Sequence, residues 1–216
     1  MKRLALGIID AQRGFMPANE GIRLNLPGFG ELPVERGELI VPNINKLFKA
    51  YEILEHTIFT TQDWHPGVTA HFSEQPNFTT TWPIHCVGGT PGAELHPAIA
   101  IPRSTERFRK GMEVLKRGED DQSYSGNNGI NDKGIQLGKR LLELGVTEVT
   151  LGGLALDYCV GKTALDLRRM DFDVVIAIDA TSGIAEESVN SMLKQFNEHD
   201  IKITSTDEIL VQMETA

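Results

Sequence analysis

The sequence predicts a three-layer α/β fold, in which a mostly parallel sheet of about six strands carries helices on both faces. Apolar runs of strand length alternate with segments whose apolar residues recur at helical spacing. Four such runs also stop at a reactive side chain: LALGII at Asp10, TIFTTQ at Asp63, MEVL at Lys116 and VTLGGLALDY at Cys159. Because the carboxyl ends of parallel strands line one crevice, we expect these side chains to meet there.

The N-terminal half begins with the strand LALGII and continues with a Gly- and Pro-rich stretch over 17–37, which lacks helical periodicity. We expect this stretch to form a long loop over the crevice. Helical spacing then predicts a helix over 40–51, with Pro42 tolerated in its first turn. A strand over 57–62 follows. The segment 63–109 is rich in Pro, Gly, Thr and His, which indicates irregular structure around the site.

The C-terminal half alternates more regularly. The run 112–116 predicts the third strand, and Asp132 begins a helix that Gly145 ends. Hydrophobic periodicity predicts the remaining elements: a strand over 146–154, a helix over 158–170, a strand over 173–178, a helix over 186–198 and a short strand over 201–204. With 216 residues, of which 40% are hydrophobic, the chain is predicted to form one domain over 1–216.

Charge and composition restrict the partners and the compartment. A net charge of −9 and a pI of about 5.2 give a field of the wrong sign for nucleic acid or an anionic membrane surface. No apolar stretch is long enough to span a bilayer, and the N-terminus lacks a signal-peptide cleavage site. Two cysteines make no disulfide framework and favour a cytoplasmic protein. We therefore expect a small-molecule substrate, and the sequence leaves open whether the chain forms a homo-oligomer.

Cys159 is the candidate nucleophile, because it lies where a strand turns into a helix. The dipole and unpaired N–H groups of a helix N-terminus favour a thiolate, and with the N–H of Ala155 they could hold an oxyanion. The alternative is a buried structural thiol, which is the commoner role of a lone cysteine. We assign that structural role to Cys86, which lies in an irregular segment with no such turn.

Asp10 suits a general base for the thiol, although an Asp after a strand can also cap a turn. Two lysines compete for the cationic role. Lys110 has Arg107 and Arg109 as neighbours, a pattern that is also typical of a solvated basic turn. Lys116 ends an apolar alternation, and it is therefore the preferred assignment.

A carboxylate and several imidazoles follow the second predicted strand. The side chains of Asp63, His65 and His71, with His85 as a further candidate, are of types that suit zinc, iron or manganese. Fewer than four tight protein ligands would leave a position for water or substrate. Histidines in a Gly- and Pro-rich loop are also ordinary surface residues, so spacing alone does not decide between the two interpretations.

Five stretches together resemble bacterial nicotinamidases of the isochorismatase-like cysteine hydrolase superfamily: IIDAQRGF, TTQDWHPGVTAHFS, TWPIHCVGGTPGAELHP, LKRGEDDQSYSG and GLALDYCVGKTALDL. The resemblance runs nearly from end to end. The piece from Trp82 to Val87 is the most discriminating, because it resembles the nicotinamidase branch and not the isochorismatases, which lack the metal site. The resemblance implies an isochorismatase-like hydrolase fold and one divalent ion, for which zinc is the first expectation and iron or manganese the alternatives.

Residue roles follow from the resemblance by position. It implies a triad of Asp10, Lys116 and Cys159, and metal ligation by Asp63, His65, His71 and His85. It places aromatic walls around a pyridine ring at Phe15, Trp82 and Tyr124, and a cis peptide bond between Leu154 and Ala155. Relatives tend to read Lys-Gly at the catalytic lysine, a dipeptide that Lys110-Gly111 preserves, so Lys110 stays an alternative to Lys116.

The implied activity is a metal-dependent cysteine amidohydrolase that converts nicotinamide to nicotinate and ammonia through a thioester, in NAD salvage. One alternative is another amidase of the same superfamily, acting on a carbamoyl or ureido substrate. A second alternative, from a different class, is a catalytically inactive relative that binds a small ligand or stores metal.

Overall fold

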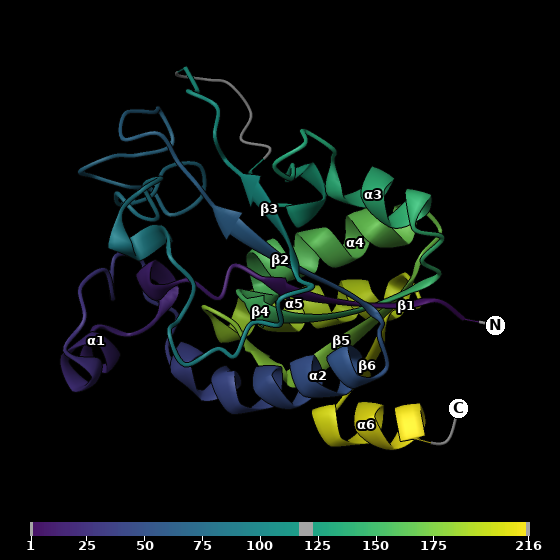
Figure 1. Ribbon diagram of the computed structural model, residues 1–216. Helices are drawn as coiled ribbons and strands as arrows, with labels where there is room; N and C mark the ends of the chain where they lie inside the picture. Colours follow the sequence, from purple (N-terminus) through teal and green to yellow (C-terminus); the bar gives the residue numbers. More distant parts are fainter. Residues whose placement is uncertain (1, 117–122, 215–216) are drawn as a thin grey trace.

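The computed structural model describes residues 2–116 and 123–214, so that 117–122, within the stretch LKRGEDDQSYSG, lie outside the described residues. Within the described part, six strands form one sheet in the order β3-β2-β1-β4-β5-β6, and every neighbouring pair is parallel (Figure 1). The strands are β1 (Leu4–Ile9), β2 (Thr57–Asp63), β3 (Glu106–Lys110), β4 (Glu148–Leu154), β5 (Asp173–Ser182) and β6 (Lys202–Thr204). The predicted fold class is confirmed.

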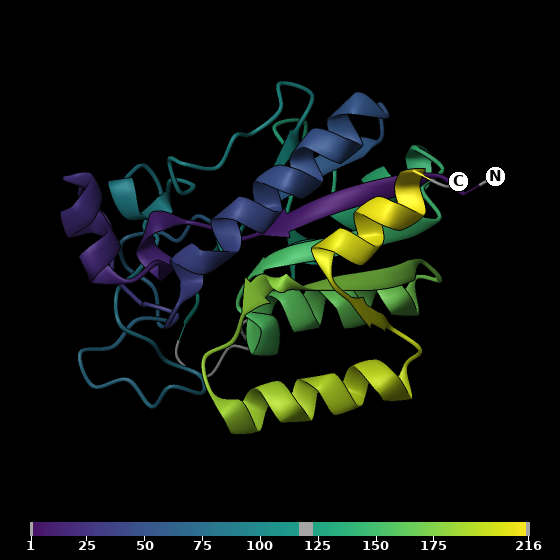
Figure 2. The ribbon, with the colours of Figure 1, turned by 90° about the horizontal axis from the view of Figure 1, so that it is seen from below.

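Helices cover both faces of this sheet, as Figure 2 shows from below. One face carries α2 (Val41–Ile53) and α6 (Thr206–Glu214), and the other carries α3 (Leu137–Glu143), α4 (Gly161–Arg169) and α5 (Glu186–Glu198). Each interface buries its own apolar core. The short helix α1 (Ala18–Leu24) lies away from these layers, beyond the carboxyl end of β1 (Figure 1). None of the described helices is both long enough and apolar enough to cross a membrane.

The strand order reverses between β1 and β4, and the crevice at the carboxyl ends of the strands lies at this reversal. The chain runs outward from β1 through β2 to β3, then returns to β4 on the other side of β1. In open α/β sheets, ligands bind outside the carboxyl ends of the strands at such a reversal. The backbones of β1 and β4 approach closely here: Gly153 has a φ of +108°, and a Cβ built on it would lie 1.9 Å from the Ile9 carbonyl oxygen.

The prediction of a strand over 112–116 is wrong, because the third strand is β3, with the sequence ERFRK. This strand lies at the edge of the sheet, and among the described strands β2 is its one neighbour, so its outward residues can be polar. Only Phe108 and Lys110 are buried, and the strand is therefore not an apolar run. Met112 and Val114, which suggested the strand, are exposed.

Several other bounds differ from the prediction. The segment 17–37 contains α1, and the irregular segment near 63–109 ends before β3. Helix α3 begins at Leu137 and not at Asp132, β5 continues to Ser182, and α6 was not predicted. A π-helical turn, Leu156–Val160, precedes α4 and carries Cys159. Single 3₁₀ turns lie at Arg13–Phe15, Gly37–Ile40, Pro91–Ala93 and Gly126–Asn128.

Candidate active site

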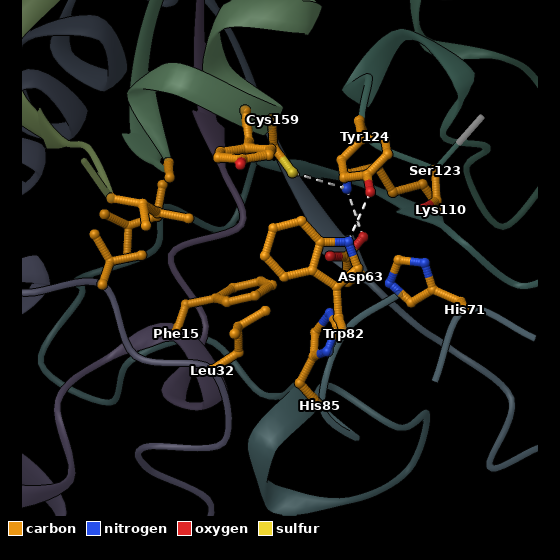
Figure 3. A pocket seen from close by; sticks show the side chains of 15 residues that line it. Phe15, Leu32, Asp63, His71, Trp82, His85, Lys110, Ser123, Tyr124 and Cys159 are labelled. Carbon is orange, nitrogen blue, oxygen red and sulfur yellow. Dashed lines mark hydrogen bonds and ion pairs between the residues drawn. The ribbon is translucent and has the colours of Figure 1, made fainter. Parts of the chain in front are cut away.

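Four reactive side chains meet at the carboxyl edge of the sheet, and Figure 3 shows three of them, Asp63, Lys110 and Cys159. Asp10 follows β1, Asp63 and Lys110 end the adjacent strands β2 and β3, and Cys159 lies in the turn after β4. Lys110 is the centre of the group: its Nζ lies 2.9 Å from Asp10 Oδ2, 2.5 Å from Asp63 Oδ1 and 3.4 Å from Cys159 Sγ. The pairing of β2 with β3 places the Asp63 and Lys110 side chains together, since these two residues are direct partners in its register.

The structure does not bring Lys116 to this group, and it places Lys110 there instead. Lys116 lies in an exposed segment after β3 and does not line the pocket beside Cys159. The residue after Lys110 explains why the Lys-Gly dipeptide indicated the lysine of this group better than the apolar run before Lys116. Gly111 has a φ of +68°, and a Cβ on it would lie 2.6 Å from the His65 ring, so a side chain there would displace that ring.

Burial and the buried charges together set the protonation of the group. It raises the pKa of the Cys159 thiol well above its ordinary value, and the opposing effect of Lys110 does not outweigh it. Burial likewise raises the pKa of the Asp10 carboxyl. The nearby Lys110 ammonium would lower this pKa but does not outweigh burial. For Lys110, burial would lower the pKa, but the carboxylates of Asp10 and Asp63 outweigh it and raise the pKa well above its usual range. The resting thiol is therefore protonated, which differs from the expected thiolate, and the ammonium keeps its charge.

Two polar side chains that the sequence analysis did not identify hold Asp10 and Asp63 in place. Thr61 Oγ1 donates a hydrogen bond to Asp10 Oδ1 at 2.6 Å. Gln12 holds the Asp63 backbone in both directions: its Nε2 donates to the carbonyl and its Oε1 accepts from the N–H, each at 2.8 Å. Burial would raise the pKa of Asp63, but Lys110 and His65 keep it well below its ordinary value, so this carboxylate is ionised.

Three histidines form a second group beside Asp63. His65, His71 and His85 are all buried, and each offers a ring nitrogen within 4.8 Å of the other two. His65 Nε2 lies 3.6 Å from Asp63 Oδ2 and, among the described residues, has no hydrogen-bond partner. Such a buried, unpaired nitrogen is costly unless something binds it, and a metal ion would do so.

The tautomers also fit metal binding. His65 Nδ1 lies 3.1 Å from the Gly111 carbonyl, and His85 Nδ1 lies 2.7 Å from the Pro83 carbonyl. A proton on each Nδ1 would leave Nε2 available as a ligand, which is the usual outer arrangement of metal-binding histidines. Burial lowers the pKa of His85 to about 4, so its ring is neutral near pH 7. The three histidines with Asp63 fit a divalent ion.

A pocket with largely apolar walls joins the two groups (Figure 3). All four residues predicted to contact substrate line it: Phe15, Trp82, Tyr124 and Ala155. The pocket also includes residues that the sequence analysis missed: Leu32, Val34, Ser123, Tyr158 and Ile184. Trp82 Nε1–H donates to the Tyr124 hydroxyl at 2.7 Å, and the Trp82 and Tyr158 rings meet edge to face with centroids 5.3 Å apart. The aromatic wall is therefore fixed by its own contacts.

The floor of the pocket follows β4. The Leu154–Ala155 peptide bond is cis, as the resemblance implied. The Ala155 carbonyl accepts from the N–H groups of Tyr158 and Val160, each at 3.0 Å, which closes the π-helical turn around Cys159. The turn thereby presents the thiol to the pocket.

Comparison with known proteins agrees with this geometry. The family model described as "Isochorismatase domain" matches residues 5–118 and 125–208. The nicotinamidase/pyrazinamidase of Mycobacterium tuberculosis is 31% identical over 199 residues, which cover 92% of this chain and 97% of that protein. The nicotinamidase of Acinetobacter baylyi is 33% identical over 194 residues, covering 83% of this chain and 81% of that protein.

Solved structures give the same result. The pyrazinamidase of Pyrococcus horikoshii in complex with zinc superposes with a TM-score of 0.77 at 33% identity, covering 94% of this chain and 99% of that one. The matches extend over both halves of the sheet and over the segments that bring the two groups together. The chain belongs to the isochorismatase family.

Proposed function

We propose that this chain is a metal-dependent cysteine amidohydrolase that converts nicotinamide to nicotinate and ammonia. The observation that carries the proposal is the position of Lys110, whose ammonium contacts Asp10 and Cys159 on one side and Asp63, next to the three histidines, on the other. The names of the relatives in Mycobacterium tuberculosis and Acinetobacter baylyi support the substrate. In the cell, the reaction would serve NAD salvage, and we expect it in the cytoplasm.

The first half of the reaction transfers the acyl group to sulfur. Asp10 takes the proton of the Cys159 thiol, and the thiolate attacks the carboxamide carbon. The backbone N–H groups of Ala155 and Cys159 hold the resulting oxyanion. Lys110 stays protonated throughout and stabilises the negative charge that passes between Asp10 and the sulfur. Asp10 returns its proton to the leaving nitrogen, so that ammonia departs and a thioester remains.

The second half releases the acid. Asp10 takes a proton from water, and the hydroxide attacks the thioester carbon. The same N–H groups hold the second oxyanion, and its collapse breaks the C–S bond. The proton on Asp10 then returns to the Cys159 sulfur. The products are nicotinate and ammonia, and the thiol is restored.

The pocket orients the substrate for this attack. Phe15 and Trp82 offer flat apolar surfaces to a pyridine ring, and burying such a ring between aromatic side chains is favourable. The residues that would hold a divalent ion are Asp63, His65, His71 and His85. When bound, that ion would supply Lewis-acid chemistry beside the pocket. Zinc is the first expectation, because the Pyrococcus horikoshii relative is described in complex with it.

The test is ammonia release from nicotinamide by purified protein whose metal content has been measured. Wild type should release ammonia, and Cys159→Ala should release none while keeping its metal. Cys86→Ala is the matched control, because Cys86 is also a buried thiol but hydrogen-bonds to the Gly92 carbonyl outside the triad. An inactive Cys86→Ala variant beside an active Cys159→Ala variant would overturn the assignment of Cys159 as the nucleophile. A folded, metal-loaded wild type that releases no ammonia would exclude nicotinamide and favour another small amide.

A further inference from the structure

Residues 25–36, which follow α1 and are called the covering loop because two of them line the pocket, are tied to residues 14–16 by backbone hydrogen bonds. After α1, the N–H groups of Gly30, Leu32 and Val34 donate to carbonyls of residues 14–16 at 2.9 Å each. Leu32 and Val34 line the substrate pocket, whereas the residue between Gly30 and Leu32 points elsewhere. That residue is Glu31, whose side chain no step of the proposed reaction uses.

The carboxylate of Glu31 occupies a space that two glycines leave open. A Cβ built on Gly92 would lie 2.0 Å from Glu31 Oε2, and one built on Gly14 would lie 2.9 Å from the same oxygen. Any side chain at Gly92 would therefore collide with the carboxylate. In this position Oε2 accepts a hydrogen bond from the backbone N–H of Cys86 at 2.8 Å. The covering loop thus reaches across the glycines to the peptide bond that joins His85 to Cys86.

Cys86 connects two of the three histidines. Its amide belongs to the His85–Cys86 peptide, and its carbonyl accepts a hydrogen bond from the His65 N–H at 3.1 Å. Its backbone is in the left-handed region, with a φ of 45°, which is uncommon for a residue with a side chain. Such a conformation persists only where neighbouring contacts hold it, and the bond to Glu31 is one of these contacts.

We propose that Glu31 is a positioning residue for the metal centre, which holds the His85–Cys86 peptide so that the His85 ring stays aligned with His65 and His71. The inference rests on the proposed metal site and extends it to the covering loop. Because Glu31 lies next to Leu32 in that loop, order in the loop and order in the metal site support each other. Outer contacts of this kind typically change metal affinity tenfold to a hundredfold when removed.

The test measures zinc affinity by competition with a chromophoric chelator. Glu31→Ala should weaken zinc binding at least about tenfold. Glu31→Gln should stay closer to wild type, because its amide oxygen can still accept from the Cys86 N–H. The matched control is Glu35→Ala, an exposed glutamate of the same loop, which should bind zinc like wild type. If Glu31→Ala binds zinc as tightly as wild type, the inference is wrong while the metal site stands.

A second variant reaches the same contact from the opposite side. Gly92→Ala should displace the carboxylate and weaken zinc binding, and adding Glu31→Ala should weaken it little further. Hydrogen exchange of the Cys86 amide in metal-free protein checks the contact without metal, and it should be faster in Glu31→Ala than in wild type. Additive losses in the double variant, or unchanged exchange, would contradict the inference. A wild type that binds no zinc at all would overturn the proposed metal site and this inference together.

Discussion

The reactive group around Lys110 and the histidine group lie side by side but are held in different ways. Asp10, Asp63 and Lys110 stand at the ends of strands, where the ladder of a parallel sheet fixes their backbone. The histidines lie in the segment between β2 and β3, whose contacts are separate hydrogen bonds between turns. In the first region one register places several groups at once. In the second, the histidines are placed by backbone hydrogen bonds between turns, such as the bond from the His65 N–H to the Cys86 carbonyl.

Because of this difference, we expect substitutions in the two regions to have different effects on stability and metal binding. A change in the strand-end region should disturb charge balance and the fold together, because the ladder and the reactive groups share the same residues. A change among the histidines should remove metal and activity with a smaller effect on the fold. Single substitutions in the two regions can test that separation.

Lys110→Met should have the largest effect. Removing the ammonium leaves the buried carboxylates of Asp10 and Asp63 side by side, and removal of one partner from a buried ion pair typically costs about 3–5 kcal/mol. Urea denaturation at pH 7 should show this loss, and ammonia release should fall below detection. Lys116→Met is the control and should change the free energy of unfolding by no more than about 0.5 kcal/mol, because its side chain is exposed. The reverse result would restore Lys116 as the catalytic lysine.

Gly153→Ala should have the next largest effect on the free energy of unfolding. A Cβ at this position would lie 1.9 Å from the Ile9 carbonyl oxygen, and the φ of +108° is itself unfavourable for alanine. We expect a loss of at least about 2 kcal/mol in the free energy of unfolding, since β1 and β4 must separate to admit the methyl group. Gly134→Ala is the matched control, because it also has a positive φ but nothing within 4 Å of the added atom. Equal losses at both positions would mean that backbone strain, and not the close approach of the strands, sets the effect.

His71→Ala should remove the metal while the sheet stays folded. Metal analysis should show less than one ion per chain, and far-UV circular dichroism should match wild type. Because a ligand at a hundred times its Kd stabilises a protein by about 2.7 kcal/mol, added zinc should raise the Tm of wild type but not that of the variant. His199→Ala, at an exposed histidine after α5, should keep the metal. A variant at His71 that still binds one ion per chain would remove this residue from the ligand set.

Trp82→Phe should have the smallest effect. The substitution keeps an aromatic wall but removes the hydrogen bond from Nε1 to the Tyr124 hydroxyl. A typical net loss of about 1 kcal/mol corresponds to a roughly fivefold rise in KM for nicotinamide, with kcat changed less. Steady-state kinetics of Trp82→Phe, Tyr124→Phe and the double variant would measure this coupling. Fully additive effects would show that the bond does not orient the wall.

The apolar strands explain what the sequence could predict. Runs buried on both faces are recognisable from composition, and they located Asp10, Asp63 and Cys159 at strand ends. Strand β3 was not recognised in this way, because an edge strand buries only alternate residues. The strand was therefore predicted at the apolar run MEVL, and the catalytic role was assigned to Lys116 instead of Lys110. The histidines were candidates by residue type and spacing, but their role stayed open until the family resemblance was considered. The aromatic residues were found only through that resemblance, since no periodic pattern marks irregular backbone.

Helix α6 was missed although its sequence contained a signal. Ser205 and Glu208 form a capping box: Ser205 Oγ accepts from the Glu208 N–H at 3.3 Å, and Glu208 Oε2 accepts from the Ser205 N–H at 3.1 Å. This spacing of Ser and Glu before an apolar run is a recognisable helix start. The pocket residues Leu32 and Val34 carried no comparable signal, because their position depends on backbone hydrogen bonds between distant loops.

The pairing of Asp63 with Lys110 across β2 and β3 also limits how the chain can change in length. A single residue inserted within β3 would turn every following side chain to the opposite face of the sheet, and the ammonium would leave the two carboxylates. A residue inserted among the exposed positions after Gly111 would leave that register intact. Homologous chains should therefore vary in length after this glycine and keep the number of residues within β3 unchanged.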